Sequence, residues 1–290
     1  MDATSPPPPQ LRSLENYTLP RDRMKRLLSD SSKTPLALVS CGSFSPITYL
    51  HLRMPEMAAD WARFNTDFEV VGAWLSPVGD AYKKAGLAAA HHRLEMCRRA
   101  TEGTWVMVDD WEALHEEYQP TANVLDHFAE ELNKDGGIET YTGERKKIRV
   151  SLLAGADLIQ TMSTPGLWSP ADLDKILGTY GAFIIEREGT DADEALANLQ
   201  KWKDNIYFIH QLVKNDVSST RIRLFLRRDM SVRWLIPQSV IDYIEANGLY
   251  KPDEGESGEK GATRAAVTAA EKGEVNKAES SKSAKKGIES

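Results

Sequence analysis

The sequence predicts an α/β fold: a single doubly wound, mostly parallel sheet with helices on both faces. Short apolar segments of strand length alternate with longer segments of helical period between residues 34 and 251. These short segments are apolar on both faces, as strands covered by helices on either side must be. The 290-residue chain is 41% hydrophobic and 27% charged. This balance supports a globular core and excludes a wholly disordered or fibrous protein.

Each element of this fold has its own segment. The expected strands are residues 36–40, 68–75, 105–108, 150–154, 182–186 and 206–209. The expected helices are residues 48–64, 88–100, 122–132, 170–179, 191–202, 219–228 and 237–247. Two adjacent glycines and a basic run indicate a surface loop over residues 133–147.

The two ends of the chain differ in composition from this domain. Residues 1–33 are rich in proline, serine and charge, and we expect a largely irregular extension with one short helix over residues 21–28. Residues 252–290 contain no aromatic residue and few branched apolar ones. Such a segment buries too little apolar area to offset its chain entropy, so it is expected to be a disordered charged tail.

Several classes of protein are excluded by composition. No apolar run has the ~18 residues that a membrane span needs, and the N-terminus lacks a signal-peptide layout, so no membrane association is expected. Cys41 and Cys97 have no metal-type spacing, which argues against zinc and disulfide frameworks and for the reducing cytoplasm or nucleus. A net charge of −7 argues against nucleic acid as a partner.

The turn after the first expected strand is a candidate anion site. Residues 41–51 read CGSFSPITYLH, which is neither a dinucleotide fingerprint nor a Walker loop. Gly42 would allow close approach of a ligand, while Ser45 and Pro46 suit the cap and first position of a helix. His51 would lean back toward an anion at that helix start. The alternative is a histidine packed between helix and sheet.

A second cluster of the same kind follows the last expected strand. Residues 215–223 read NDVSSTRIR and open a helix. Hydroxyl groups can cap this helix, and the forked donors of Arg221 and Arg223 suit phosphate. A cap on a basic surface helix is the alternative. Two helix starts of this type at one edge of a sheet favour a shared ligand.

Together, the segments around His51 and Arg223 resemble the two signatures of the nucleotidyltransferase superfamily with its (H/T)xGH-type site. Three segments between them, SPVGDAYKK at residues 76–84, GADL at 155–158 and PGLW at 165–168, resemble eukaryotic nicotinamide/nicotinate mononucleotide adenylyltransferases. The resemblance extends from about residue 35 to residue 250 and implies a Rossmann-like nucleotidyltransferase fold.

The resemblance also implies an activity. The expected reaction is adenylyl transfer from ATP to nicotinamide mononucleotide or nicotinate mononucleotide, giving NAD or deamido-NAD and pyrophosphate. The mononucleotide 5′-phosphate would attack the α-phosphate of ATP in line, without a covalent enzyme intermediate. Mg²⁺ would arrive with ATP rather than in a dedicated metal site, and the protein would be a homo-oligomer.

The same resemblance assigns residues to roles. His51 and Arg223 would be catalytic, Lys84 would meet the mononucleotide phosphate, and Tyr118 would stack on the pyridine ring where animal members often have tryptophan. The full set of expected substrate-binding residues is Gly42, Ser43, Phe44, His51, Lys84, Tyr118, Thr121, Gly155, Asp157, Leu167, Trp168, Arg187, Asn215, Ser219, Thr220, Arg221, Ile222 and Arg223.

Two other functions compete with this one. The first is another adenylyl- or cytidylyltransferase of the superfamily, acting on a pantetheine or flavin phosphate. The second is a nucleotide-binding or chaperone-like protein whose catalysis has lapsed. Pro55 leaves room for the latter, because proline removes a hydrogen bond from the helix that carries His51.

Overall fold

The computed structural model describes residues 13–187 and 192–251. Contacts divide the chain into a first unit, Met1–Tyr250, and a second, Lys251–Ser290. The expected tail over residues 252–290 and the first twelve residues of the expected extension lie outside the described residues.

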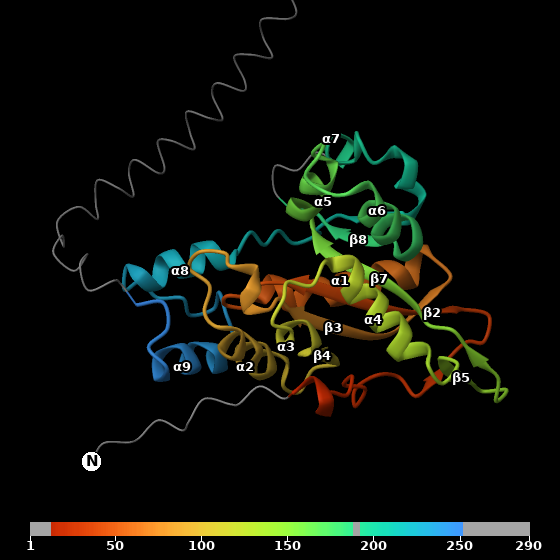
Figure 1. Cartoon of the computed structure of the whole chain (residues 1–290), viewed down its shortest axis with the longest axis horizontal. Coiled ribbons are helices and arrows are strands. Elements are labelled where there is room, and N and C mark those ends of the chain that lie inside the picture. Colours follow the sequence, from red (N-terminus) through yellow and green to blue (C-terminus); the bar gives the residue numbers. More distant parts are fainter. Residues whose placement is uncertain (1–12, 188–191, 252–290) are drawn as a thin grey trace, which may run out of the picture. The chain divides into compact units, whose positions relative to one another are not determined.

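The first unit is built on a six-stranded parallel sheet (Figure 1). Its strands are β2 (Thr34–Gly42), β3 (Phe68–Pro77), β4 (Val106–Val108), β7 (Arg149–Gly155), β8 (Ala182–Ile185) and β9 (Ile206–Ile209). They lie in the order β4-β3-β2-β7-β8-β9, with every neighbouring pair parallel. The doubly wound prediction is confirmed, and the six expected segments form these strands. The strand order reverses between β2 and β7, which is where such sheets bind ligands.

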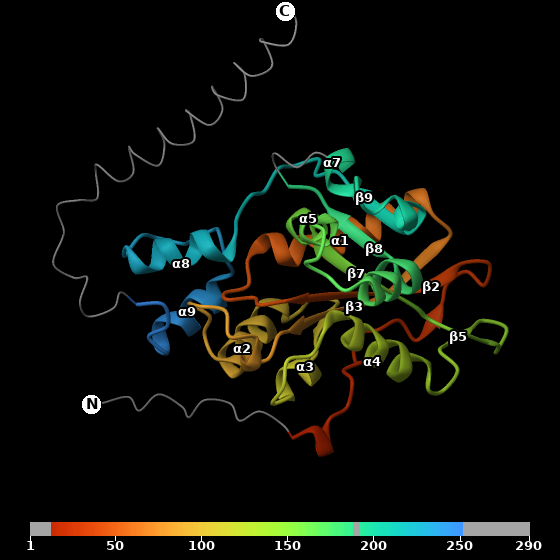
Figure 2. The ribbon, with the colours of Figure 1, turned by 45° about the horizontal axis from the view of Figure 1, so that its top comes forward.

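Helices cover both faces of this sheet (Figure 2). They are α1 (Tyr49–Asn65), α2 (Ala90–Thr101), α3 (Trp111–Leu114), α4 (Thr121–Asn133), α5 (Ala156–Ser163), α6 (Pro170–Leu173), α7 (Ala192–Leu196), α8 (Ser219–Arg227) and α9 (Gln238–Ala246). The alternation of side chains along β2 divides the core. Leu36 and Leu38 pack in the cluster with α1, α2 and α9, whereas Ala37 and Val39 pack in the cluster with α4 and α5.

Two expected helices are divided in the structure. The segment 170–179 forms α6, capped by Ser169, followed by a π-helix, η3 (Asp174–Tyr180). The segment 191–202 becomes α7 and a 3-10 helix, η4 (Gln200–Asn205). Asn205 at the end of η4 donates hydrogen bonds to the carbonyl oxygens of Leu177 (2.6 Å) and Gly178 (3.1 Å) in η3. The helical period of a sequence reports only local preferences, so it does not predict where tertiary contacts of this kind divide a helix.

The segment that carries His51 remains helical throughout. Helix α1 runs without interruption from Tyr49 to Asn65, although the buried Pro55 lies inside it. The proline therefore does not end the helix next to the site. No helix of the described residues combines the length and apolar character that crossing a bilayer requires.

The expected loop and the expected short helix near the N-terminus form a small second sheet instead. Strand β1 (Leu27–Leu28) pairs with β5 (Ile138–Thr140), which pairs antiparallel with β6 (Arg145–Lys146). Leu28 and Ile138 are both buried, so burial of apolar side chains explains the pairing. Residues 13–33 thus pack against the domain.

Candidate active site

A cavity of about 280 Å³ opens at the carboxyl ends of β2, β7 and β8, beside the point where strand order reverses. Eleven of the residues singled out from the sequence line it: Gly42, Ser43, Phe44, His51, Lys84, Gly155, Asp157, Arg187, Ser219, Thr220 and Arg223. Seven others do not line it: Tyr118, Thr121, Leu167, Trp168, Asn215, Arg221 and Ile222. The structure therefore brings His51, Lys84 and Arg223 together. It leaves Asn215, Arg221 and Ile222 of the second cluster outside this cavity, together with the residues expected near the pyridine ring.

Direct hydrogen bonds join the two distant signatures. The hydroxyl of Ser219 donates to the carbonyl oxygen of Pro46 at 2.8 Å, across 173 residues. The Nη1 of Arg223 donates to the carbonyl oxygen of Ser45 at 2.7 Å, across 178 residues. The start of α8 is thus held against the turn that precedes α1.

Arg223 is a buried cation with donor capacity to spare. Its side chain is only 7% exposed, and its Nε has no hydrogen-bond partner among the described residues. Burial lowers the pKa of the guanidinium, but an arginine keeps its charge at neutral pH. Arg223 lines the cavity, so its positive charge lies beside any anion bound there. This geometry suits an anionic ligand such as phosphate.

His51 is fixed in one tautomer. Its Nδ1 accepts the backbone N–H of Thr48 at 3.0 Å, so the ring proton sits on Nε2. The edge-to-face ring of Phe44, 5.2 Å away and at 74°, packs against the imidazole. His51 lines the cavity and can offer it a neutral N–H donor. Burial and the charge of Arg187 lower its pKa to about 4.

We expect His51 to remain neutral between about pH 5 and 8, because its pKa in the folded protein is about 4 rather than the usual 6.5. The unfolded chain binds this proton as pH falls through 6.5, and the folded protein only near 4. The stability contributed by neutral His51 is therefore complete above pH 6.5 and is lost as the pH falls toward 4. An NMR titration of the imidazole, assigned with His51→Gln, measures this. A midpoint near 6.5 would show that the ring is solvated and not held as described.

The expected cap of α1 is wrong in one detail. Thr48, not Ser45, is the N-cap, and the helix begins at Tyr49. The Ser45 hydroxyl instead contacts the Tyr250 hydroxyl at 2.7 Å and accepts the backbone N–H of Ala88 at 3.0 Å. These contacts tie the turn to two distant segments, which no local capping pattern reveals.

The opposite wall of the cavity comes from the β7–α5 turn. Asp157 in the first turn of α5 forms an ion pair with Arg187, which follows β8. Gly155 is the N-cap of α5 and has ordinary backbone angles of −83° and 159°. A methyl group added to it would meet no atom of the described residues within 4 Å. The helix start is thus open to a ligand.

We expect Gly155→Ala to raise the KM for the nucleotide by about tenfold, because the added methyl group occupies space that the ligand needs. The melting temperature should stay equal or rise slightly, since alanine fits this backbone conformation without strain. Initial rates at varied nucleotide concentration and thermal unfolding measure the two effects. An unchanged KM would show that no ligand approaches this turn.

Of the residues expected to meet the pyridine nucleotide, Lys84 alone lines the cavity among the described residues. Lys84 is exposed and forms no ion pair with any described residue. Tyr118 is 47% exposed and stacks on Tyr82, with ring centroids 5.7 Å apart at 25°. Trp168 donates its indole N–H to the Thr161 hydroxyl at 3.1 Å. Tyr118 thus presents a half-exposed aromatic ring in contact with the segment that carries Lys84.

The remaining expected residues have other surroundings. Leu167 is 61% exposed, and Thr121 begins α4. Asn215 accepts the backbone N–H of Val217 at 3.0 Å. Arg221 lines a small neighbouring cavity with Asp157 and Arg187, while the side chain of Ile222 is buried in the core and contributes nothing to either cavity.

Arg93 is an organising residue that sequence reasoning missed. It is fully buried on α2 and donates hydrogen bonds to the carbonyl oxygens of Ser43 (3.1 Å), Val78 (2.6 Å) and Ala88 (2.8 Å). It therefore joins the turn before α1 to the segment that leads to Lys84. An arginine on the apolar face of a predicted helix was the available signal.

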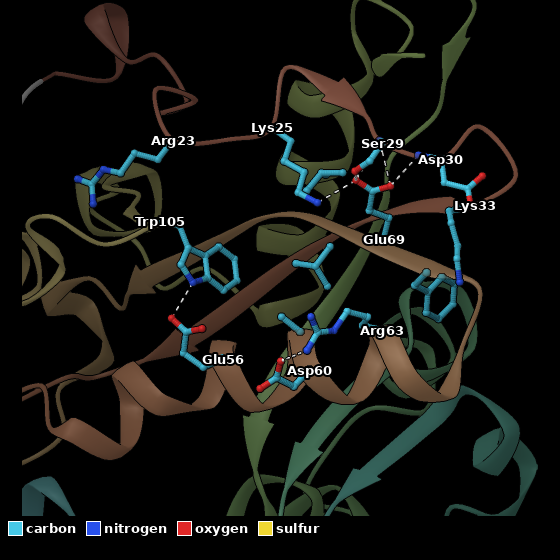
Figure 3. Close-up of a pocket in the computed structure, with 14 residues that line it drawn as sticks. Arg23, Lys25, Ser29, Asp30, Lys33, Glu56, Asp60, Arg63, Glu69 and Trp105 are labelled. Atoms are coloured by element: carbon cyan, nitrogen blue, oxygen red, sulfur yellow. Dashed lines mark hydrogen bonds and ion pairs between the residues drawn. The ribbon is translucent and has the colours of Figure 1, made fainter. Parts of the chain in front are cut away.

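A second cavity, of about 480 Å³, lies near the amino ends of β3 and β4 (Figure 3). Four basic and four acidic side chains line it. Lys25 pairs with Glu69 at 2.8 Å, and the Trp105 indole donates to Glu56 at 2.7 Å. With its charges balanced in this way, the cavity offers no surplus of positive charge to a phosphate, in contrast to the cavity around Arg223.

The described residues contain no group of three or more histidine, cysteine, aspartate or glutamate side chains placed to hold a metal ion. The carboxylates that face the cavity are already engaged. Asp157 pairs with Arg187, and Glu186 contacts His210 at 3.1 Å.

The fold and this cavity define a nucleotidyltransferase-type protein, and comparison with known proteins agrees. Residues 39–225 match the family described as Cytidylyltransferase-like. The nicotinamide/nicotinic acid mononucleotide adenylyltransferase of Schizosaccharomyces pombe is 51% identical over 84% of this chain and 68% of its own. The corresponding enzyme 1 of Bos taurus is 38% identical over 79% of this chain and 93% of its own. The chain belongs to this family of mononucleotide adenylyltransferases.

Two further comparisons concern the length of a relative and the fold. Enzyme 1 of Saccharomyces cerevisiae is 51% identical over 83% of this chain, and the chain spans 62% of that relative's length. A solved structure of Plasmodium falciparum nicotinic acid mononucleotide adenylyltransferase complexed with APC has a TM-score of 0.54 at 23% identity, covering 74% of this chain and 96% of that one. This second likeness supports the fold.

Proposed function

We propose that the protein transfers the adenylyl group of ATP to nicotinamide mononucleotide and nicotinate mononucleotide, giving NAD or deamido-NAD and pyrophosphate. The observation that carries this proposal is the convergence of His51 and Arg223 on one cavity at the carboxyl edge of the sheet. The names of relatives at 51% identity support the choice of substrates.

The reaction needs no general base. The second pKa of the mononucleotide 5′-phosphate is about 6, so this phosphate is largely dianionic at neutral pH and its attacking oxygen carries no proton. That oxygen forms a bond to the α-phosphorus of ATP, the bond from this phosphorus to the bridging oxygen breaks, and pyrophosphate leaves. The obstacle is repulsion between two anions and the charge that accumulates on pyrophosphate.

The cavity residues address that obstacle with fixed donors. Arg223 supplies a fixed positive charge at the cavity wall, and His51 offers the N–H on Nε2 without adding a charge that varies with pH. Lys84 would hold the mononucleotide phosphate at the rim. Donors that are already in place cost no reorganisation when the charge develops, which is how such sites accelerate transfer.

We propose Mg²⁺ as the ion that accompanies ATP. It would neutralise part of the triphosphate charge and be held mainly by phosphate oxygens and water. The engagement of Asp157 with Arg187 supports this arrangement over a protein-built metal site.

The choice of acceptor is tested by initial rates of the full chain with ATP and Mg²⁺. Nicotinamide mononucleotide, nicotinate mononucleotide, pantetheine 4′-phosphate and flavin mononucleotide are compared at matched concentrations. We expect turnover with the two pyridine nucleotides only. Faster turnover with pantetheine phosphate or the flavin would favour the other transferases, and ATP binding without any turnover would favour a lapsed enzyme.

The family resemblance also leads us to propose a homo-oligomer that works in the cytoplasm or nucleus. Light scattering after size-exclusion chromatography measures the first property, and imaging of the tagged full chain measures the second.

A further inference from the structure

The N-terminal extension contacts a buried acid that follows β4. The hydroxyl of Tyr17 donates a hydrogen bond to Asp109 at 2.7 Å, across 92 residues. The Nε2 of His127 on α4 lies 2.9 Å from the same hydroxyl. In both ribbon views the described start of the chain, drawn red, runs along the side of the domain where α3 and α4 lie (Figures 1 and 2).

These three side chains close a ring through Trp111. Asp109 follows β4, is fully buried, and accepts the backbone N–H of Trp111 at 3.3 Å. The Trp111 ring stacks on His127, with centroids 4.2 Å apart and only 7° between planes. The one hydroxyl proton of Tyr17 is donated to Asp109, so the hydroxyl oxygen can only accept from His127 Nε2. The start of α3 is therefore held by a hydrogen bond on one side and a stacked ring on the other.

Helix α3 in turn contacts the segment that leads to Lys84. The Ser76 hydroxyl donates to the buried Glu112 carboxyl at 2.7 Å. A methyl group on Gly79 would lie 3.2 Å from the carbonyl oxygen of Glu112, so α3 and this segment approach closely. Tyr118 follows α3 and stacks on Tyr82 in the same segment. The two parts of the proposed mononucleotide side thus meet at α3.

We propose that Tyr17 is a positioning residue for the mononucleotide: through Asp109 and α3 it sets the placement of Tyr118 and of the segment that carries Lys84. This inference rests on the proposed function. Burial raises the pKa of Asp109 to about 7, and the hydrogen bond from Tyr17 opposes that shift by favouring the carboxylate. The extension contributes to acceptor binding without touching the acceptor.

The test is Tyr17→Phe in the full chain, which removes one hydroxyl and keeps the ring. We expect the KM for nicotinamide mononucleotide to rise about fivefold, equivalent to about 1 kcal/mol, the usual net contribution of one hydrogen bond. The KM for ATP and kcat should stay within twofold, because these contacts do not join α3 to His51 or Arg223, whose printed partners are Thr48 and Ser45. Tyr141→Phe, the same change at a tyrosine that is 72% exposed, should alter none of these values.

Asp109→Asn is a second variant that tests the same connection. It should raise the KM for the mononucleotide as Tyr17→Phe does, and the double variant should be no worse than the poorer single variant, since both changes break one connection. Equal rises in both KM values, or a fall in melting temperature with unchanged KM, would overturn the inference and leave Tyr17 a purely structural residue. If the unaltered protein forms no NAD, the proposed function fails instead, so the two failures are distinguishable.

Discussion

Arg223→Lys is expected to lower kcat by about 10³-fold, the lower end of the range for losing an arginine that faces a reacting phosphate. The guanidinium donates one Nη to the carbonyl oxygen of Ser45, and its residue lines the cavity. A lysine ammonium is a point charge and cannot hold the turn before α1 and donate to phosphate in one plane. The charge is retained, so the loss would measure geometry rather than net charge.

A neighbouring arginine provides the matched control. Arg227 lies one turn further along α8 and is exposed. Arg227→Lys should leave kcat within twofold and the melting temperature unchanged. Single-turnover rates and thermal unfolding of both variants measure the comparison. A kcat for Arg223→Lys within threefold of the unaltered protein would remove Arg223 from the proposed catalytic group.

The second large effect is expected for His51→Ala, which should lower kcat by about 10²–10³-fold with little change in KM. The Nε2–H donor is fixed by the bond from Thr48 to Nδ1, so it is in place before charge develops on the phosphates. An interaction that strengthens only in the transition state affects kcat more than KM. Loss of the bond to Thr48 should also cost about 1 kcal/mol of helix stability.

His92→Ala is the control for this change. His92 is also partly buried, and its Nδ1 is 2.9 Å from the Tyr243 hydroxyl, but it lies on α2 and does not line the cavity. Its removal should lower stability without lowering kcat. Steady-state kinetics in which His51→Ala keeps full kcat would assign the imidazole to packing between helix and sheet, the alternative that its position in sequence leaves open.

The strands of the main sheet could be predicted from the sequence, because they are buried on both faces and appear as uninterrupted apolar segments. Elements that are stabilised by contacts with distant segments could not be predicted in this way. The two-residue strand β1 forms only because β5 lies beside it, and α3 is a single turn held by Asp109. Short elements of this kind carry no periodicity of their own.

The same distinction applies to the site. The meeting of Gly42 with Arg223 could be predicted, because the carboxyl ends of parallel strands share one edge of the sheet. The contacts of Ser45, Arg93 and Tyr17 could not, since each joins segments that approach only in the folded chain. Sequence motifs identify the groups expected to touch phosphate, whereas the groups that hold them in place are joined only by contacts between distant segments.

The most direct measurement is the stoichiometry of products when the purified full chain is given ATP, nicotinamide mononucleotide and Mg²⁺. If the cavity at the carboxyl edge joins two nucleotides, NAD and pyrophosphate should appear in equal amounts, and neither should form when the mononucleotide is left out. Release of ADP and inorganic phosphate, or consumption of ATP that does not depend on the mononucleotide, would contradict the account.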